Sequence, residues 1–181
     1  MKKAIFMDRD GVICKEKNLF YRGSPITLPK QFEWIPESKE AFSFLSKLED
    51  FLLIVVTNQS IINKGLLSVE DFHEINRPIY DELKKYNKNL GGLYFCPHTP
   101  KEECDCRKPK IGMLLQAKKE LNLDLRKSYF IGDATSDIQT GKNAGCKTIL
   151  VGTGYCGKDY KFDVKPDFVI KNLLEMPSIL K

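Results

Sequence analysis

The chain has 181 residues, of which 42% are hydrophobic and 29% charged, a balance typical of one folded globular domain. No apolar run approaches the roughly 18 residues of a membrane span. The start, Met-Lys-Lys followed by a short apolar run, does not have the long apolar region of a signal peptide. We therefore expect a single cytoplasmic domain over 1–181, as a monomer or a weak homo-oligomer.

The net charge of +5 suits an anionic ligand such as a phosphate ester. The lysines are scattered along the chain, so the charge alone does not indicate a nucleic-acid-binding face. Six cysteines in a chain expected in the cytoplasm argue against a disulfide framework. Three of them lie within 96–106, and this concentration asks for a separate explanation.

Hydrophobic periodicity predicts strands that alternate with helices along the chain. The expected strands are 4–7, 51–56, 93–95, 129–131, 148–151 and 168–170, and the expected helices are 38–49, 68–85, 113–121, 136–144 and 172–180. Ser38 and Ser68 are the expected N-caps of the first two helices, and Pro177 is expected to break the last one. Residues 13–36 have no clean period and are expected to form a flap. This alternation predicts an α/β fold with a doubly wound parallel sheet.

Polar side chains follow three of the expected strands at the point where each strand ends. These side chains are Asp8 and Asp10, then Thr57, Asn58 and Ser60, and finally Asp133 and Asp137, with Arg107 and Lys108 on a loop between the second and third groups. In an open parallel sheet the carboxyl ends of the strands meet at one edge, where ligands bind. We therefore expect these groups to converge on one site.

The convergence suits phosphoryl transfer. Asp8 and Asp133 can supply the hard oxygen ligands that magnesium prefers. One carboxylate can serve as a nucleophile and a second as general acid and base. Thr57 and Lys108 are of the types that stabilise charge on phosphoryl oxygens.

A second cluster, C-x-H-x5-C-x-C, joins Cys96, His98, Cys104 and Cys106. Four Cys and His ligands are what a closed tetrahedral zinc site requires, and no position is left for water. We therefore expect a structural zinc ion that fixes the loop just before Arg107 and Lys108.

The motifs D-x-D-G-V at 8–12, T-N at 57–58, Lys108 and G-D-x-x-x-D at 132–137, in this order, resemble those of the haloacid dehalogenase superfamily of phosphatases. The resemblance covers nearly the whole chain and implies a Rossmann-like fold. It implies that Asp8 is the nucleophile and a magnesium ligand, and that Asp10 is the general acid and base and binds magnesium through its carbonyl. It also implies that Asp133 binds magnesium, while Lys108 neutralises the phosphoryl group and Thr57 and Asn58 hold it.

The segment CPH at 96–98 and CDCRKPKIGML at 104–114, with T-N-Q-S at 57–60 and G-T-G-Y at 152–155, narrows the resemblance to one branch. This branch contains the D-glycero-D-manno-heptose 1,7-bisphosphate 7-phosphatases and the histidinol-phosphate phosphatases, in which a zinc loop, here 96–106, replaces a large cap domain. The resemblance implies that heptose 1,7-bisphosphate is converted to the 1-phosphate. The implied substrate contacts are Asn58, Gln59, Ser60, Arg107 and Lys110.

Three alternatives stay open. The five-residue spacer between His98 and Cys104 is similar to that of the histidinol-phosphate phosphatases. The net charge would also suit a polynucleotide end phosphatase, although the sequence has no stripe of alternating aromatic and basic residues. A non-catalytic, zinc-bound binding module is disfavoured because all the expected catalytic residues are present.

Overall fold

The computed structural model describes residues 1–15, 27–86, 88 and 90–180. Six parallel strands form one sheet in the order β3-β2-β1-β4-β5-β6. The strands are β1 (Lys3–Met7), β2 (Phe51–Asn58), β3 (Gly92–Cys96), β4 (Tyr129–Gly132), β5 (Lys147–Val151) and β6 (Phe168–Ile170). The predicted α/β fold with a parallel sheet is confirmed, and no large cap domain is present in the described residues.

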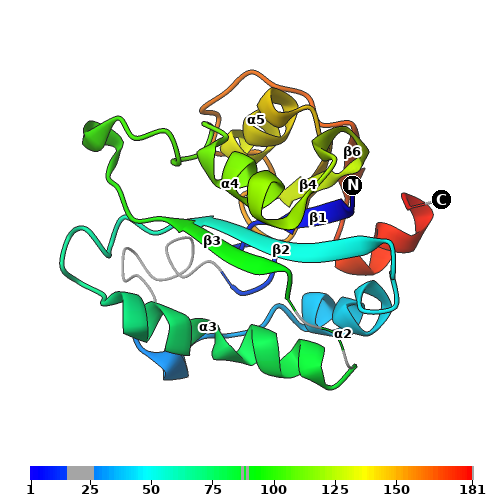
Figure 1. The fold of residues 1–181 in the computed structure, drawn as a ribbon, viewed down its shortest axis with the longest axis horizontal. Helices are drawn as coiled ribbons and strands as arrows, with labels where there is room; N and C mark the ends of the chain where they lie inside the picture. The colour runs from blue at the N-terminus through cyan, green and yellow to red at the C-terminus, as the bar shows by residue number, and fades with distance from the viewer. Residues whose placement is uncertain (16–26, 87, 89, 181) are drawn as a thin grey trace.

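Helices cover both faces of the sheet (Figure 1). The first pair, α2 (Pro36–Leu45) and α3 (Val69–Lys84), lies on one face, and α4 (Gly112–Leu121) and α5 (Thr135–Ala144) lie on the other. Short 3-10 helices are η1 (Pro29–Gln31), η2 (Pro100–Glu102), η3 (Leu125–Lys127) and η4 (Leu173–Ser178). In the described part of the chain, no helix combines the length and the apolar character that crossing a bilayer requires.

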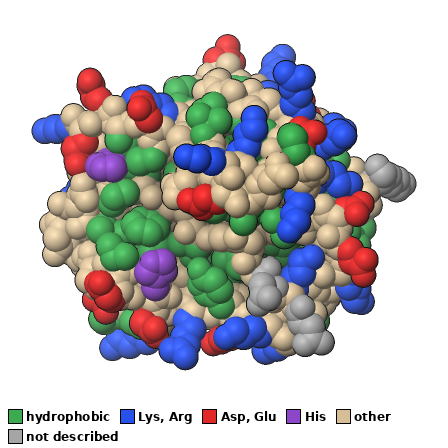
Figure 2. Space-filling view, viewed as in Figure 1, with side chains coloured by type: hydrophobic (Ala, Val, Ile, Leu, Met, Phe, Trp, Pro, Cys, Tyr) green, Lys and Arg blue, Asp and Glu red, His purple; other side chains and the backbone are tan. Residues whose placement is uncertain are grey.

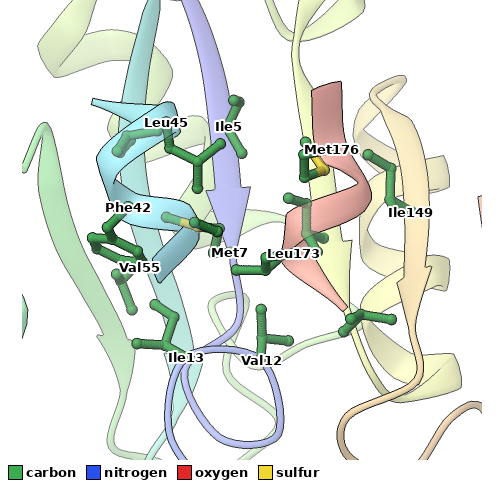
Figure 3. Close-up of a cluster of buried hydrophobic side chains, with 14 of the residues drawn as sticks. Ile5, Met7, Val12, Ile13, Phe42, Leu45, Val55, Ile149, Leu173 and Met176 are labelled. Carbon is green, nitrogen blue, oxygen red and sulfur yellow. The ribbon is translucent and has the colours of Figure 1, made fainter. Parts of the chain in front are cut away.

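The central strand β1 supplies the core on both sides of the sheet because successive side chains of a strand point to opposite faces. Ile5 and Met7 pack with side chains of α2 and η4, among them Phe42 and Leu173 (Figure 3). Ala4 and Phe6 pack on the other side, in the cluster that contains residues of α4. A strand that is buried on both faces has an unbroken run of apolar residues. In β1 this run ends at Met7, and the polar residues of the site begin at Asp8.

Of the two expected N-caps, one differs from the structure and one is confirmed. Ser38 is not an N-cap: α2 begins at Pro36, and the buried Ser38 hydroxyl donates to the carbonyl of Val12 at 2.5 Å. Proline suits the first helical position because its missing N–H would have no partner there. Ser68 is the N-cap of α3, as predicted, and accepts from the N–H of Asp71.

The expected C-terminal α-helix over 172–180 is wrong. The segment forms the 3-10 helix η4, with the Asn172 side chain accepting from the N–H of Leu174 at its start. Pro177 lies inside η4 and lacks the N–H that a longer α-helix would need.

Residues 16–26 of the expected flap lie outside the described residues. The two ends of the flap pair with each other, because the N–H of Lys15 donates to the carbonyl of Glu33 and that of Ile35 donates to Ile13. Trp34 packs edge-on against Phe42 with the ring centroids 5.3 Å apart. The described ends of the flap are therefore joined to α2.

Candidate active site

Lys108 and two carboxylates form the centre of a buried site at the carboxyl edge of the sheet. The Nζ atom of Lys108 lies 2.9 Å from Oδ1 of Asp8 and 2.6 Å from Oδ1 of Asp137. It also donates to the carbonyl of Val56 at 3.2 Å. Burial opposes the charge of this lysine, but Asp137 and Asp8 outweigh it and raise the pKa of Lys108. The lysine is therefore held charged against the expected nucleophile.

Neighbouring strands bring a third carboxylate to the same place. Met7 of β1 is in register with Ile131 of β4, and Asp8 and Asp133 lie just beyond these partners. Carboxylate oxygens of Asp8, Asp133 and Asp137 all lie within 4.8 Å of one another. Three acidic groups this close are the hard oxygen donors that Mg²⁺ prefers, and the cluster fits that ion.

The protonation of these carboxylates reflects their burial. Burial raises the pKa of Asp8 to about 7, although Lys108 acts against the shift. Burial, reinforced by repulsion from Asp137 and Asp8, raises the pKa of Asp133 to about 9. A divalent cation among these groups would remove the repulsion and favour their ionised forms.

Two glycines leave the space that Asp133 occupies. A Cβ atom on Gly11, which has a φ of +79°, would lie 2.3 Å from Oδ2 of Asp133, and one on Gly154 would lie 2.0 Å from the same atom. The N–H of Tyr155 donates to this Oδ2 at 2.6 Å, and the hydroxyl of Thr153 donates to the carbonyl of Gly11 at 2.6 Å. The segment after β5 therefore orients Asp133, a role that sequence reasoning missed.

Asp10 is held by a residue that sequence reasoning also missed. Arg9 donates from Nε and Nη2 to both carboxylate oxygens of Asp10, at 2.8–3.1 Å. Gln59 donates from Nε2 to Oδ2 of Asp10 at 3.0 Å and to the hydroxyl of Thr57 at 2.9 Å. An arginine between two aspartates gives no sequence signal that distinguishes a buried partner from a surface charge.

The end of β2 contacts the Lys108 loop. Asn58 accepts from the N–H of Lys108 at 3.1 Å and donates to its carbonyl at 3.4 Å. The Asn58 side chain thus fixes the backbone that carries the catalytic candidate Lys108. Thr57 is buried beside it, with its hydroxyl joined to Gln59. The expected roles of Thr57 and Asn58 toward a phosphoryl group stay predictions.

The second predicted cluster also comes together. The sulfur–sulfur distances among Cys96, Cys104 and Cys106 are 3.2, 3.4 and 3.5 Å, and Nδ1 of His98 lies 3.2 Å from the Cys106 sulfur. Sulfur ligands at about 2.3 Å from a tetrahedral ion would lie about 3.8 Å apart. The sulfur atoms lie slightly closer together than in such a site, and the four side chains form a group of soft and imidazole ligands of the kind that holds a metal ion.

Two of the expected substrate-binding residues donate hydrogen bonds to backbone carbonyls of the Cys/His loop. Arg107 donates to the carbonyl of His98 at 3.0 Å, and Lys110 donates to that of Glu103 at 2.9 Å. Both residues line a pocket of 280 Å³ that also includes Lys108 and Thr99. Ser60 follows β2 and is half-buried. Contacts of Gln59, Ser60, Arg107 and Lys110 with substrate stay predictions.

Known proteins are similar to this chain over its whole length. A family model described as "HAD-hyrolase-like" matches residues 105–176. A relative from Pasteurella multocida, named D-glycero-beta-D-manno-heptose-1,7-bisphosphate 7-phosphatase, is 38% identical over 100% of this chain and 98% of its own. The chain belongs to the heptose-1,7-bisphosphate 7-phosphatase family. It is therefore a phosphatase of the haloacid dehalogenase-like hydrolases, as its sequence motifs predict.

Other members of the family give further detail. A relative from Campylobacter jejuni, 40% identical over 82% of this chain and 81% of its own, is named for the alpha anomer of the same bisphosphate. A solved crystal structure is that of D,D-heptose 1,7-bisphosphate phosphatase from B. bronchiseptica, complexed with magnesium and phosphate. The sequence of that protein is 28% identical to the sequence of this phosphatase. Its TM-score is 0.85, over 98% of this chain and 97% of that one.

Proposed function

We propose that this phosphatase removes the C7 phosphate of D-glycero-D-manno-heptose 1,7-bisphosphate through an aspartyl phosphate on Asp8. The observation that carries the proposal is the Asp8–Lys108 pair at 2.9 Å, inside a cluster of three carboxylates. Full-length similarity to relatives named for this bisphosphate supports the choice of substrate.

In the first step, a carboxylate oxygen of Asp8 attacks phosphorus and the bond from phosphorus to the sugar oxygen breaks. Asp10 gives its proton to that sugar oxygen, so the leaving group departs as an alcohol. Lys108 stays charged beside Asp8 and offsets the negative charge that gathers on the phosphoryl oxygens. Thr57, whose hydroxyl accepts from Gln59, would donate that hydroxyl to the same oxygens.

In the second step, Asp10 is a carboxylate and takes a proton from water as the water oxygen attacks the aspartyl phosphate. The bond between phosphorus and the Asp8 oxygen breaks, inorganic phosphate leaves, and both aspartates return to their starting states. The Mg²⁺ that Asp8, Asp133 and the Asp10 carbonyl would hold supplies positive charge at the phosphoryl oxygens. Asp137 positions Lys108 through its 2.6 Å contact.

The Cys/His loop would hold a structural zinc ion, and we propose that this ion fixes the segment that carries Arg107 and Lys108. The pocket of 280 Å³ beside this segment is lined by Arg107, Lys108 and Lys110. The Nζ atom of Lys108 contacts Asp8 and Asp137. The two cations of this pocket that suit the second phosphate of a bisphosphate are therefore Arg107 and Lys110. A cytoplasmic location and a monomeric or weakly oligomeric state stay predictions.

The face of the molecule drawn in Figure 2 gives no support to the nucleic-acid alternative. Lys and Arg side chains are interspersed with Asp and Glu over the face in Figure 2, and no continuous basic stripe crosses it. Binding of nucleic acid without sequence preference needs a basic groove with aromatic stacking platforms. The short spacer between His98 and Cys104 still favours testing histidinol phosphate as a second substrate.

The test is phosphate release with magnesium from the alpha and beta anomers of the heptose bisphosphate and from histidinol phosphate, side by side. We expect kcat/KM for one bisphosphate anomer to exceed that for histidinol phosphate by about 100-fold, equivalent to about 2.7 kcal/mol of transition-state binding. A higher kcat/KM for histidinol phosphate than for both bisphosphate anomers would overturn the proposed substrate. Full activity of Asp8→Asn on any ester would overturn the mechanism.

A further inference from the structure

The carboxyl group of Asp10 is held from three directions. Arg9 contacts both oxygens, Gln59 contacts Oδ2, and the thiol of Cys14 lies 3.5 Å from Oδ1. The paired contacts from one guanidinium group fix the plane of the carboxylate as well as its position. Gln59 joins the same carboxylate to Thr57, so Asp10 and Thr57 share one positioning group.

Arg9 itself is built into the protein interior. It is 2% exposed, and its guanidinium carbon lies 5.8 Å from the centroid of the Phe72 ring on α3. Phe72 is fully buried and packs on Phe95 with the ring centroids 4.6 Å apart. The Nη1 atom has no hydrogen-bond partner among the residues that the structure describes.

This arrangement is a poor way to gain stability. Moving a guanidinium group out of water costs several kcal/mol, and a buried ion pair often stabilises no more than apolar side chains of the same volume. A buried N–H group without a partner adds a further cost. Because the pair lies next to Asp8, its position points to a role in the reaction.

We propose that Arg9 is a positioning residue that fixes the carboxyl group of Asp10 where it can deliver a proton to the leaving oxygen of the substrate. The inference rests on the proposed function, because it needs Asp10 to be the general acid. It adds one expectation to the proposed function: the loss of kcat/KM on replacing Arg9 must depend on the leaving group of the substrate. Alkyl phosphates need a proton on the departing oxygen, whereas the 4-nitrophenolate group leaves without one.

The experiment compares kcat/KM of Arg9→Met on the heptose bisphosphate and on 4-nitrophenyl phosphate, since kcat/KM reports the steps up to the first phosphoryl transfer. We expect a fall of about 100-fold on the sugar phosphate and of less than about 5-fold on the aryl phosphate, because only the first needs the acid. In an Asp10→Asn background, Arg9→Met should cause almost no further loss on either ester. Arg77→Met, at an exposed α3 position, is the matched control and should change neither value.

Equal losses on the two esters, or the full loss in the Asp10→Asn background, would overturn the inference. If Arg9→Met does not fold by circular dichroism, Arg9→Lys decides, because it keeps the charge but not the paired contacts. Arg9→Lys should show the same leaving-group dependence in smaller degree, and its absence would also overturn the inference. If the wild type cleaves glycerol 3-phosphate but not the heptose bisphosphate, the proposed substrate fails, and the comparison is made with glycerol 3-phosphate.

Discussion

Lys108 lies between two carboxylates, 2.9 Å from Asp8 and 2.6 Å from Asp137, although α2, β2, α3 and β3 lie between it and Asp8 in the chain. The lysine is almost fully buried and forms an ion pair with each acid. The stability of the site and its chemistry therefore depend on the same ion pairs.

Asp8→Asn should abolish turnover because an amide cannot form the aspartyl phosphate. We expect kcat to fall by at least about 1000-fold, or about 4 kcal/mol in activation free energy, with the fold retained. Phosphate release and circular dichroism on the same sample measure both effects. Near-native hydrolysis by this variant would show that another group attacks phosphorus.

Lys108→Met should lower both activity and stability. It leaves Asp8 and Asp137 buried without a counter-charge, and we expect a loss of about 3 kcal/mol in the free energy of unfolding. Denaturant unfolding measures the loss. Lys110→Met, two positions away and exposed, should change stability by less than about 0.5 kcal/mol. Similar losses for the two variants would contradict a special role for the buried pairs.

Magnesium should stabilise the protein more at pH 8.5 than at pH 5.5. The metal-free fold raises the pKa of Asp8 to about 7 and that of Asp133 to about 9, both from 3.8. Between pH 4 and these values the folded state binds more protons than the unfolded state, so metal-free stability falls as pH rises. Magnesium needs the ionised carboxylates and should therefore bind more tightly as pH rises.

Thermal unfolding with EDTA and with saturating magnesium at several pH values tests this relationship. At 100 times its Kd, magnesium should add about 2.7 kcal/mol, which corresponds to a rise of about 7 °C in Tm for a domain of this size. The rise should shrink toward pH 5.5. A magnesium effect that does not vary with pH would mean that Asp8 and Asp133 do not bind it.

Gly154→Ala should weaken magnesium binding. The added Cβ would lie 2.0 Å from Oδ2 of Asp133 and 2.8 Å from Cα of Gly11, so the carboxylate must move. We expect magnesium affinity to fall at least about 10-fold, the usual size of effects from groups that orient a ligand. Titration followed by activity and by Tm measures the affinity.

Gly145→Ala is the matched control for this prediction. Gly145 ends α5 with a φ of +75°, and an added Cβ would meet nothing closer than 4.0 Å. The variant should cost about 1 kcal/mol of stability through backbone strain and leave the magnesium affinity unchanged. A loss of magnesium affinity in both variants would assign the effect to general destabilisation.

The cysteine cluster should bind close to one zinc ion per chain. Cys106→Ser removes one of four ligands and should release the ion and lower Tm, because binding at such a site contributes to folding. Metal content by elemental analysis and Tm measure the effect. Cys156→Ser, an exposed thiol outside the cluster, should change neither. Full zinc content in Cys106→Ser would show that the ion lies elsewhere.

The sequence by itself determined the sheet and the identity of most site residues. Short apolar runs such as 51–56 are typical of strands buried on both faces, and a parallel sheet brings the ends of β1, β2 and β4 to one edge. The spacing of Cys96, His98, Cys104 and Cys106 predicted a single cluster because all four lie within a few residues of one another. Ser68 was readable as an N-cap because its partner, Asp71, is local in sequence.

Only the tertiary structure decided which groups hold the site residues in place. The guanidinium group of Arg9 contacts Asp10 and lies near the ring of Phe72 on α3, and Gly154 adjoins Asp133 because β5 lies beside β4. Ser38 is not an N-cap because its hydroxyl donates to the carbonyl of Val12, a residue distant in the chain. These contacts join residues far apart in the chain, and their energies depend on burial and distance, neither of which a local sequence pattern records.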